Sequence, residues 1–182
     1  MLGFGLGLNK GGGKVTGGDP VEERPALSDE YIFTDNNLYG WSASGISGQL
    51  VSGANYAAYE DNSTTNFDHR IIRSSYDAEL YTDQPNDIYY KIRVFRGDIS
   101  QNLTGIFRVS AFGKALTLDE ADRELPFATE KTYTGVIQDV VYSNQYYYID
   151  FHKDPSEYDQ KDLTGGFMAI YSIQFANYDL SA

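Results

Sequence analysis

The stretch DIYYKIRVFRG, residues 87–97, decides the fold because its apolar side chains recur with a period of two. Successive side chains of a β-strand point to opposite faces of the sheet, so a half-buried strand alternates between apolar and polar residues. One face of this stretch carries Tyr90, Ile92 and Val94, and the opposite face carries Arg93. The pattern therefore predicts a β-strand that buries one face in a hydrophobic core.

The same period recurs on both sides of this strand. Further candidate strands lie at residues 30–35, 36–45, 47–60, 68–80, 103–113, 131–142, 143–153 and 165–180. Residues 68–80 also fit a short helix, and the one good helix candidate is LDEADREL at residues 118–125. Short strands at near-regular spacing, separated by turn signals, are typical of sandwiches and barrels. We therefore expect an all-β fold, a single antiparallel β-sandwich of jelly-roll type over residues 30–182.

Alternation also predicts which side chains share a face within three of these strands. The expected pairs are Tyr147 with Ile149, Phe107 with Val109, and Tyr171 with Ile173. In residues 143–153, Tyr146, Tyr148 and Asp150 then fall on the face opposite Tyr147. The pattern alone leaves open which of these two faces is buried.

The first 29 residues form a different region, which begins MLGFGLGLNKGGGKVTGGDP. Apolar side chains alternate there with glycine, at Leu2, Phe4, Leu6 and Leu8. Glycine loses more conformational freedom on folding than any other residue, so this region supplies no core of its own. We expect an extended docking arm whose side chains fill pockets on a partner while its backbone adds to a sheet edge. A frayed tail is the alternative.

Composition excludes several classes of function. The net charge is −12 and the basic residues are scattered, whereas nucleic-acid binding needs a basic patch that neutralises phosphates. The 182 residues include no cysteine, which excludes disulfide scaffolds and thiolate chemistry. No apolar run approaches the roughly 20 residues that span a bilayer. We therefore expect neither nucleic acid nor membrane as a partner.

No motif in the chain indicates catalysis. Only two histidines occur, His69 and His152, and neither stands in a cluster with the spacing of metal ligands. Gly13 and Lys14 are followed by Val15, so the glycine-rich region does not match a phosphate-binding loop. We expect a protein that is not an enzyme and that needs no metal or cofactor.

Aromatic residues supply the candidate binding side chains. Trp41, Tyr146 and Tyr148 could form a platform for a glycan or for a protein interface, because aromatic rings are favoured at both. A large ring next to a glycine early in a sandwich is usually part of the core, however, and Trp41 follows Gly40. We therefore expect Trp41 in the core, with the platform as the alternative.

The order of the segments resembles a known family. Five segments follow one another as in carbohydrate-binding modules of the galactose-binding-like jelly roll. They are LYGWSASG at residues 38–45, the strand at 87–97, EKTYTGVIQDV at 130–140, YYYIDFHKD at 146–154 and the last strand, which a glycine-rich turn precedes. The resemblance covers residues 38–180. It implies a jelly-roll fold and a glycan as ligand.

The first ten residues carry a second resemblance. MLGFGLGLNK is similar to the Leu/Gly-alternating beginnings of small virion proteins of tailed bacteriophages. That resemblance implies a virion location and other virion proteins as partners. The leading hypothesis is a non-enzymatic head decoration or cement protein, present in several copies in a symmetric assembly, that docks on capsid subunits through its arm. The alternatives are a tail or fibre component that contacts a host-surface glycan, or a carbohydrate-binding module.

Overall fold

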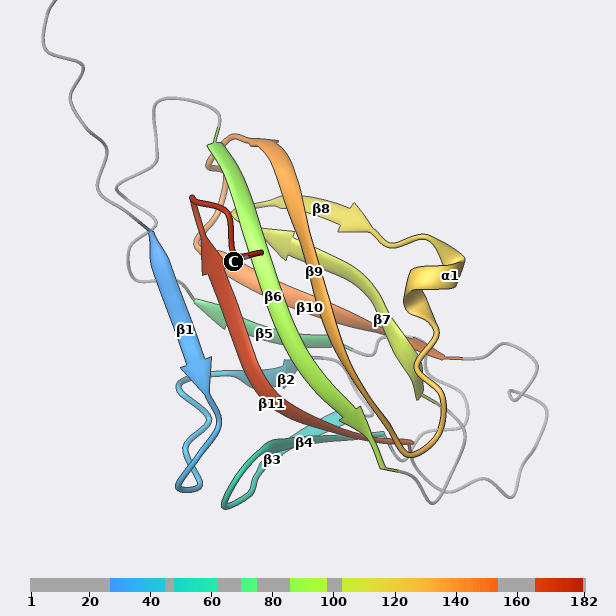
Figure 1. The fold of residues 1–182 in the computed structure, drawn as a ribbon. Coiled ribbons are helices and arrows are strands. Elements are labelled where there is room, and N and C mark those ends of the chain that lie inside the picture. The colour runs from blue at the N-terminus through green and yellow to red at the C-terminus, as the bar shows by residue number, and fades with distance from the viewer. Residues whose placement is uncertain are drawn as a thin grey trace, which may run out of the picture.

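The computed structural model describes residues 27–44, 48–61, 70–74, 86–97, 103–153 and 166–181. Within these residues the chain forms eleven strands and one short helix (Figure 1). The elements are β1 Ser28–Ile32, β2 Ser42–Ser44, β3 Gly48–Ser52, β4 Ala57–Asp61, β5 Arg70–Ser74, β6 Asn86–Arg96, β7 Leu103–Ala111, β8 Lys114–Thr117, α1 Glu120–Arg123, β9 Thr129–Val140, β10 Tyr146–Lys153 and β11 Gly166–Ala176.

The strands form two antiparallel sheets. The six-stranded sheet has the order β3-β4-β11-β6-β9, with β1 also paired to β11, and the five-stranded sheet has the order β2-β5-β10-β7-β8. From β4 to β11 the chain passes repeatedly from one sheet to the other. As a result, strands β4-β11-β6-β9 face strands β5-β10-β7-β8 (Figure 1). This arrangement of eight strands is that of a jelly roll. The expected fold class, an antiparallel β-sandwich of jelly-roll type, is confirmed.

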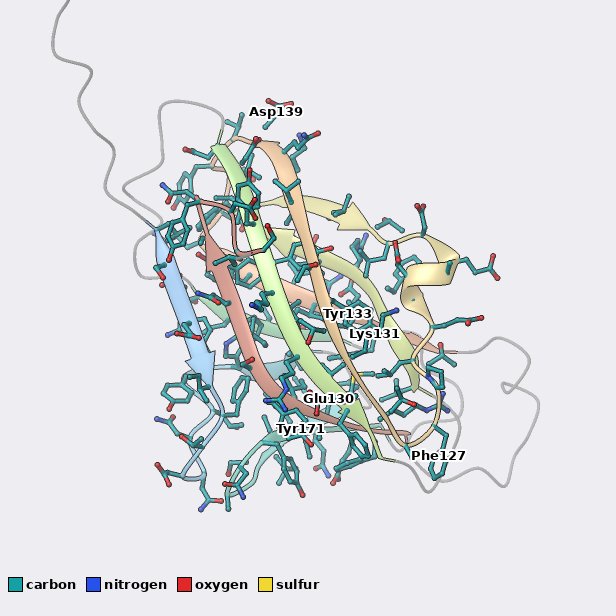
Figure 2. The ribbon with its side chains drawn as sticks, viewed as in Figure 1. Phe127, Glu130, Lys131, Tyr133, Asp139 and Tyr171 are labelled. Carbon is teal, nitrogen blue, oxygen red and sulfur yellow. The ribbon has the colours of Figure 1, made fainter. Side chains whose placement is uncertain are left out.

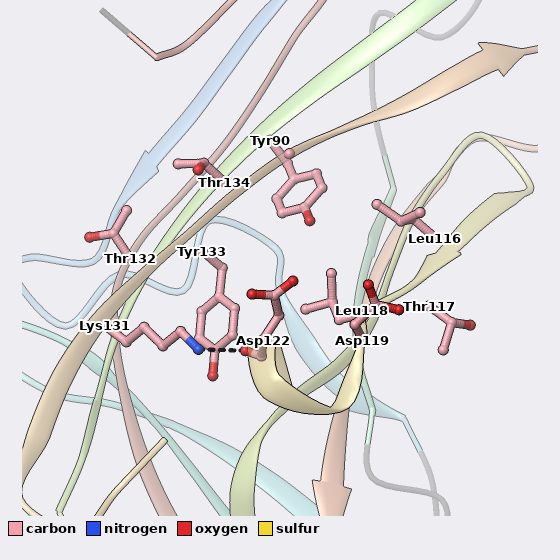
Figure 3. Close-up of a pocket in the computed structure, with 11 residues that line it drawn as sticks. Tyr90, Leu116, Thr117, Leu118, Asp119, Asp122, Lys131, Thr132, Tyr133 and Thr134 are labelled. Carbon is pink, nitrogen blue, oxygen red and sulfur yellow. Dashed lines mark hydrogen bonds between the residues drawn. The ribbon is translucent and has the colours of Figure 1, made fainter. Parts of the chain in front are cut away.

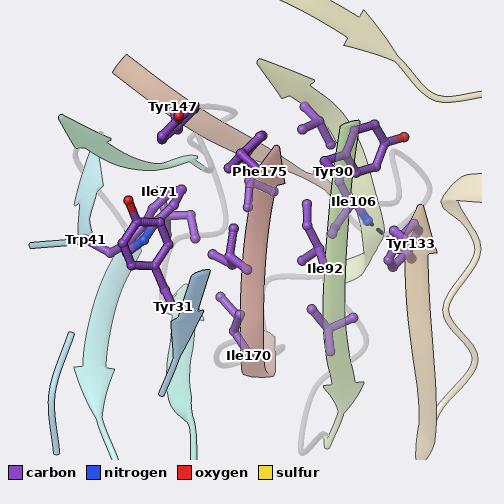
Figure 4. Close-up of a cluster of buried hydrophobic side chains, with 14 of the residues drawn as sticks. Tyr31, Trp41, Ile71, Tyr90, Ile92, Ile106, Tyr133, Tyr147, Ile170 and Phe175 are labelled. Atoms are coloured by element: carbon purple, nitrogen blue, oxygen red, sulfur yellow. Dashed lines mark hydrogen bonds between the residues drawn. The ribbon is translucent and has the colours of Figure 1, made fainter. Parts of the chain in front are cut away.

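The core lies between the two sheets and is built by the predicted alternation. In β6 the side chains of Ile88, Tyr90, Ile92 and Val94 are all buried. Across the sandwich, Tyr147 of β10 stacks on Phe175 of β11 with ring centroids 4.1 Å apart (Figure 4). Each large buried aromatic side chain removes apolar surface from water, and this burial stabilises the folded state by roughly 25 cal/mol per Å².

Two strands depart from simple alternation because each contains an irregularity. Opposite β10, the register of β7 shifts between Arg108 and Ile106, so that Ile106 rather than Phe107 shares the core with Val109. In β11 a shift between Ile170 and Ser172 brings Ile173 back into the core and leaves Tyr171 half-buried. A bulge inserts one unpaired residue and exchanges the faces beyond it. The expected pairs Phe107 with Val109 and Tyr171 with Ile173 were therefore wrong, whereas Tyr147 and Ile149 are both buried.

The ends and connections also differ in detail from expectation. The helix predicted at residues 118–125 is present only as α1, four residues long and without a buried side chain. Residues 70–74 form strand β5 rather than a helix. Leu27 is buried and β1 begins at Ser28, so the sandwich starts slightly before residue 30.

The last strands of both sheets lie along the same side of the sandwich. The six-stranded sheet ends at β9 and the five-stranded sheet ends at β8, and α1 connects the two (Figure 1). No further strand covers either edge within the described residues.

Candidate functional site

The outer face of the five-stranded sheet carries an unusual group of polar and aromatic side chains. We call it the arginine–tyrosine face; it comprises Arg70, Arg108, Tyr146, Tyr148 and Asp150. Tyr146, Tyr148 and Asp150 follow one another at every second position of β10, which places them on the side opposite Tyr147. The register sets Arg70 of β5 and Arg108 of β7 directly opposite Asp150, one on each side.

Asp150 holds both guanidinium groups in place. Nε of Arg70 donates to Oδ1 at 2.5 Å, and Nε of Arg108 donates to Oδ2 at 2.6 Å. The Asp150 side chain is only 11% exposed, so these ion pairs are less screened than surface pairs. Asp150 thus fixes two guanidinium groups on one face of the sheet.

Tyr148 lies between the same two arginines. The Arg70 guanidinium carbon is 4.3 Å from the centre of the Tyr148 ring, and that of Arg108 is 5.7 Å away. These distances lie within the range of cation–π contacts. Tyr146 is 45% exposed and lies nearer the start of β10. The face therefore combines fixed hydrogen-bond donors with aromatic surface, on strands rather than on loops.

The structure separates the three aromatic residues that the sequence proposed for a platform. Trp41 is 2% exposed and packs edge-on against Tyr31, with centroids 5.8 Å apart, so it belongs to the core and is not available to a surface ligand (Figure 4). Tyr146 and Tyr148 reach the arginine–tyrosine face. The arm residues Leu2, Phe4, Leu6 and Leu8 lie outside the described residues.

Sequence reasoning missed two members of this face. Asp150 was expected on the same side as Tyr148, but nothing near Arg70 or Arg108 in the sequence indicates that they flank it. Arg70 and Arg108 are 80 and 42 residues away from Asp150. Only the strand order of a jelly roll places β5 and β7 on either side of β10.

The six-stranded sheet has a comparable ion pair on its outer face. Arg93 of β6 donates to Glu130 of β9 and lies 4.8 Å from the ring centre of Tyr171. Figure 2 labels Glu130 and Tyr171. Here both partners are about half exposed, at 51% and 44%, and the carboxylate meets a single arginine. Exposed pairs of this kind contribute little to stability. The two faces therefore share their chemistry but differ in burial.

A second surface is a groove on the open side of the sandwich (Figure 3). We call it the edge groove; its volume is about 410 Å³. It is lined by Tyr90, Leu116, Thr117, Leu118, Asp119, Asp122, Lys131, Thr132, Tyr133, Thr134 and Gly135. They come from β6, β8, the start of α1 and β9, the elements that border the open side.

Lys131 connects the two borders of the edge groove. Its ammonium donates to the carbonyl oxygens of Asp122 and Glu124, at 2.5 and 3.0 Å, and lies 4.6 Å from the ring centre of Tyr133 (Figure 3). The Tyr133 hydroxyl accepts from the backbone N–H of Ile106 at 3.4 Å and donates to a carbonyl of α1. The groove wall is therefore fixed at several points.

The tyrosines of the edge groove are weaker acids than usual. Burial, together with the nearby carboxylate of Asp122, raises the pKa of Tyr90 to about 12. Burial also raises the pKa of Tyr133 to about 12, against the opposing effect of its hydrogen bond from Ile106. Both hydroxyls therefore keep their protons at neutral pH and can act as hydrogen-bond donors.

The described residues offer no other recognisable site chemistry. Among them, no three His, Cys, Asp or Glu side chains gather closely enough to hold a metal ion. The described part of the chain also contains no helix that is long and apolar enough to cross a membrane.

Comparison with known proteins finds similarity in structure but not in sequence. No protein-family model matches the chain, and no curated protein matches it significantly. Among solved structures, the xylan-binding domain CBM22-1 of Xyn10C from Paenibacillus barcinonensis has a TM-score of 0.45 and 11% identity, over 82% of this chain and 94% of that one. The tandem CBM22-1–CBM22-2 domain of the same protein gives 0.45 and 11%, over 84% of this chain and 46% of that one.

A third similar structure contains the CBM22-1 and GH10 modules of endo-1,4-beta-D-xylanase 10B from Clostridium thermocellum in complex with xylohexaose. Its TM-score is 0.41 at 10% identity, over 83% of this chain and 28% of that one. The chain thus spans less than half of the second and third structures. Values this low describe a general likeness in the arrangement of strands and do not indicate what this chain binds.

Proposed function

We propose that this protein is a non-catalytic carbohydrate-binding domain that holds a glycan against its arginine–tyrosine face. The observation that supports the proposal is the position of Tyr148 between two arginines that a largely buried aspartate fixes. No step of the proposed function requires bond cleavage, a metal or a cofactor.

The chemistry of a sugar suits this face. A pyranose ring has apolar C–H surfaces and a rim of hydroxyl groups. The rings of Tyr146 and Tyr148 offer apolar area, and the guanidinium groups of Arg70 and Arg108 donate to hydroxyl oxygens. Hydrogen bonds to charged groups contribute about 1.5–3 kcal/mol, more than neutral ones.

Preorganisation supports the proposal further. Arginine has about 2 kcal/mol of rotamer entropy to lose when it is immobilised. Here Asp150 already holds both arginines from β5 and β7 before any ligand arrives. A ligand that meets fixed donors loses less free energy to side-chain ordering than one that meets mobile donors.

The test is retention of the purified full chain on immobilised polysaccharides, with xylan, cellulose and mannan as probes, followed by calorimetry with soluble oligosaccharides. Tyr148→Ala should weaken binding about tenfold, which corresponds to 1.4 kcal/mol. Tyr56→Ala is the control, because Tyr56 is 36% exposed and packs against Phe167 at the other sheet. Failure of every polysaccharide to retain the protein, or equal binding by Tyr148→Ala and the parent, would contradict the proposal.

The virion role predicted from the first residues stays a prediction, as does the virion location. Its carriers, Leu2, Phe4, Leu6 and Leu8, lie outside the described residues. Docking on capsid subunits and a symmetric multi-copy assembly therefore rest on the sequence alone. The alternative of a tail or fibre component that contacts a host-surface glycan would use the same arginine–tyrosine face.

A further inference from the structure

The edge groove contains a tyrosine hydroxyl group that no described residue bonds. Tyr90 is 2% exposed, and its ring is part of the core (Figure 4). Its hydroxyl points into the edge groove (Figure 3), where it makes no hydrogen bond with any residue that the structure describes. A ligand in the groove can therefore accept a hydrogen bond from this hydroxyl.

At a glycine, the backbone of β9 passes close to the Tyr90 hydroxyl. Gly135 lies beside it in β9, opposite Tyr90 in the register. A Cβ at Gly135 would lie 2.5 Å from the hydroxyl oxygen and 2.7 Å from Cζ of the ring. Any larger residue would therefore push the tyrosine back. Glycine in the middle of a strand normally costs stability, so its presence here is consistent with an access route.

The edge groove borders a smaller hollow. A second hollow of about 170 Å³ shares Tyr90, Thr134 and Gly135 with the edge groove and extends to Asp179 and Leu180 near the end of β11. Tyr90 thus contributes to the lining of both hollows.

We propose that the edge groove is a second binding site for the neutral sugar residues of a glycan chain. This inference deepens the proposed function and rests on it, since both sites would take the same class of ligand. The site is separate from the arginine–tyrosine face: it lies on the open edge between the sheets, whereas that face covers the outside of the five-stranded sheet.

The lining selects neutral hydroxyl groups over charged ligands. The carboxylates of Asp119 and Asp122 repel an anionic sugar. A hydroxyl both donates and accepts, so it can accept from Tyr90 while it donates to Asp122 or to a threonine. An ammonium group only donates and would leave the Tyr90 proton without an acceptor. The Lys131 ammonium also lies within the groove already and opposes a second cation.

The test is a backbone amide titration by NMR of the isotope-labelled full chain with xylohexaose, cellohexaose and mannohexaose. One of these should shift the amides of residues 131–135 and 116–118. Tyr90→Phe removes only the hydroxyl, and loss of one hydrogen bond should weaken binding at these amides about 3- to 10-fold. Tyr142→Phe, which also removes a hydroxyl from a partly buried ring but outside the groove, should bind like the parent.

Each result separates the two proposals. Shifts confined to residues around Tyr148 overturn the edge groove and leave the proposed function standing. Shifts confined to the groove support this inference and overturn the assignment of the glycan to the arginine–tyrosine face. Shifts at neither surface overturn both. Equal affinity of Tyr90→Phe and the parent would also overturn the edge-groove inference. So would amide shifts in the groove that are as large with the anionic chain hexagalacturonate as with a neutral chain.

Discussion

At the scale of single residues, two carboxylates with the same arginine chemistry occupy different environments. Asp150 is 11% exposed at the side chain and accepts from Arg70 and Arg108, whereas Glu130 is 44% exposed and pairs with Arg93 alone. Coulomb energy rises as water is excluded, and so does the cost of leaving a charge without a partner. We therefore expect the burial of a carboxylate, more than the number of its ion pairs, to decide how much it contributes to the free energy of unfolding.

We predict that Asp150→Ala lowers the free energy of unfolding by about 2–3 kcal/mol. The value lies somewhat below the usual range for a broken buried pair because the two arginines are about one-third exposed and water can solvate them. Urea denaturation followed by tryptophan fluorescence gives the measurement. Glu130→Ala is the control and should change the urea midpoint little. Equal midpoints for the two variants would show that burial is not the deciding factor.

At the scale of elements, α1 is held to the sandwich by backbone contacts and by one of its side chains, Arg123, whose guanidinium carbon lies 5.2 Å from the ring centre of Phe107. None of its residues is buried. Its carbonyl at Arg123 accepts from the Tyr133 hydroxyl, and the following Leu125 donates its N–H to Thr104 of β7 at 2.6 Å. Gly105 of β7 lies directly beneath this turn, where an added Cβ would overlap the Arg123 carbonyl.

We predict that Gly105→Ala costs about 3 kcal/mol, the upper part of the range for overpacking, because a backbone carbonyl cannot move aside as a side chain can. Gly40→Ala is the comparison: it has φ of 80° but open space, with the nearest atom 3.7 Å away, and should cost about 1 kcal/mol for its left-handed backbone. Thermal and urea unfolding of both variants test the difference. If Gly105→Ala is no less stable than Gly40→Ala, the close contact between Gly105 and the Arg123 carbonyl of α1 is contradicted.

At the scale of the whole molecule, Leu27 belongs to the core of the sandwich. This residue is 1% exposed and its N–H bonds the side chain of Asn177, so the start of the sandwich is tied to the end of the last strand. Tyr31 and Phe33, which follow closely, also belong to the core.

We predict that deletion of residues 1–18 leaves the urea midpoint of the sandwich unchanged. Deletion of residues 1–33 should instead prevent stable folding, because it removes β1 and three core side chains, each contributing roughly 2–5 kcal/mol. Unfolding curves of both truncated proteins, alongside the full chain, give the answer. A loss of stability on removal of residues 1–18 would show that the arm contributes to the core.

A second prediction at this scale concerns alkaline pH. Tyr90 and Tyr133 have pKa values raised from 10.0 to about 12 in the folded protein. An acid whose pKa is raised on folding stabilises the folded state fully below its unfolded pKa, and this stabilisation is lost as pH rises towards the folded pKa. The free energy of unfolding should therefore fall between pH 10 and 12. Urea midpoints across this range should drop less steeply for Tyr90→Phe than for the parent. An identical slope would contradict the raised pKa of Tyr90 in the folded protein.

Part of the candidate site could be predicted from the sequence. The alternation of YYYID in β10 places Tyr146, Tyr148 and Asp150 on one face, and the structure has them there. The same logic could not find Arg70 and Arg108, because contacts between strands depend on sheet order rather than on local spacing. Nor could it identify Tyr90 as a groove residue, since its ring is an ordinary core ring and only its hydroxyl reaches the surface.

The amino-acid sequence by itself determined the class of fold, because a period of two is a local property that any half-buried strand must satisfy. It also favoured Trp41 as a core residue over a surface platform, and the structure buries Trp41 in the core. The tertiary structure alone decided which strands are neighbours and where the bulges fall. Bulges in β7 and β11 brought Ile106 inward and turned Tyr171 outward, against the local pattern. These choices depend on how two sheets close around one shared core, and that condition acts on residues far apart in the chain.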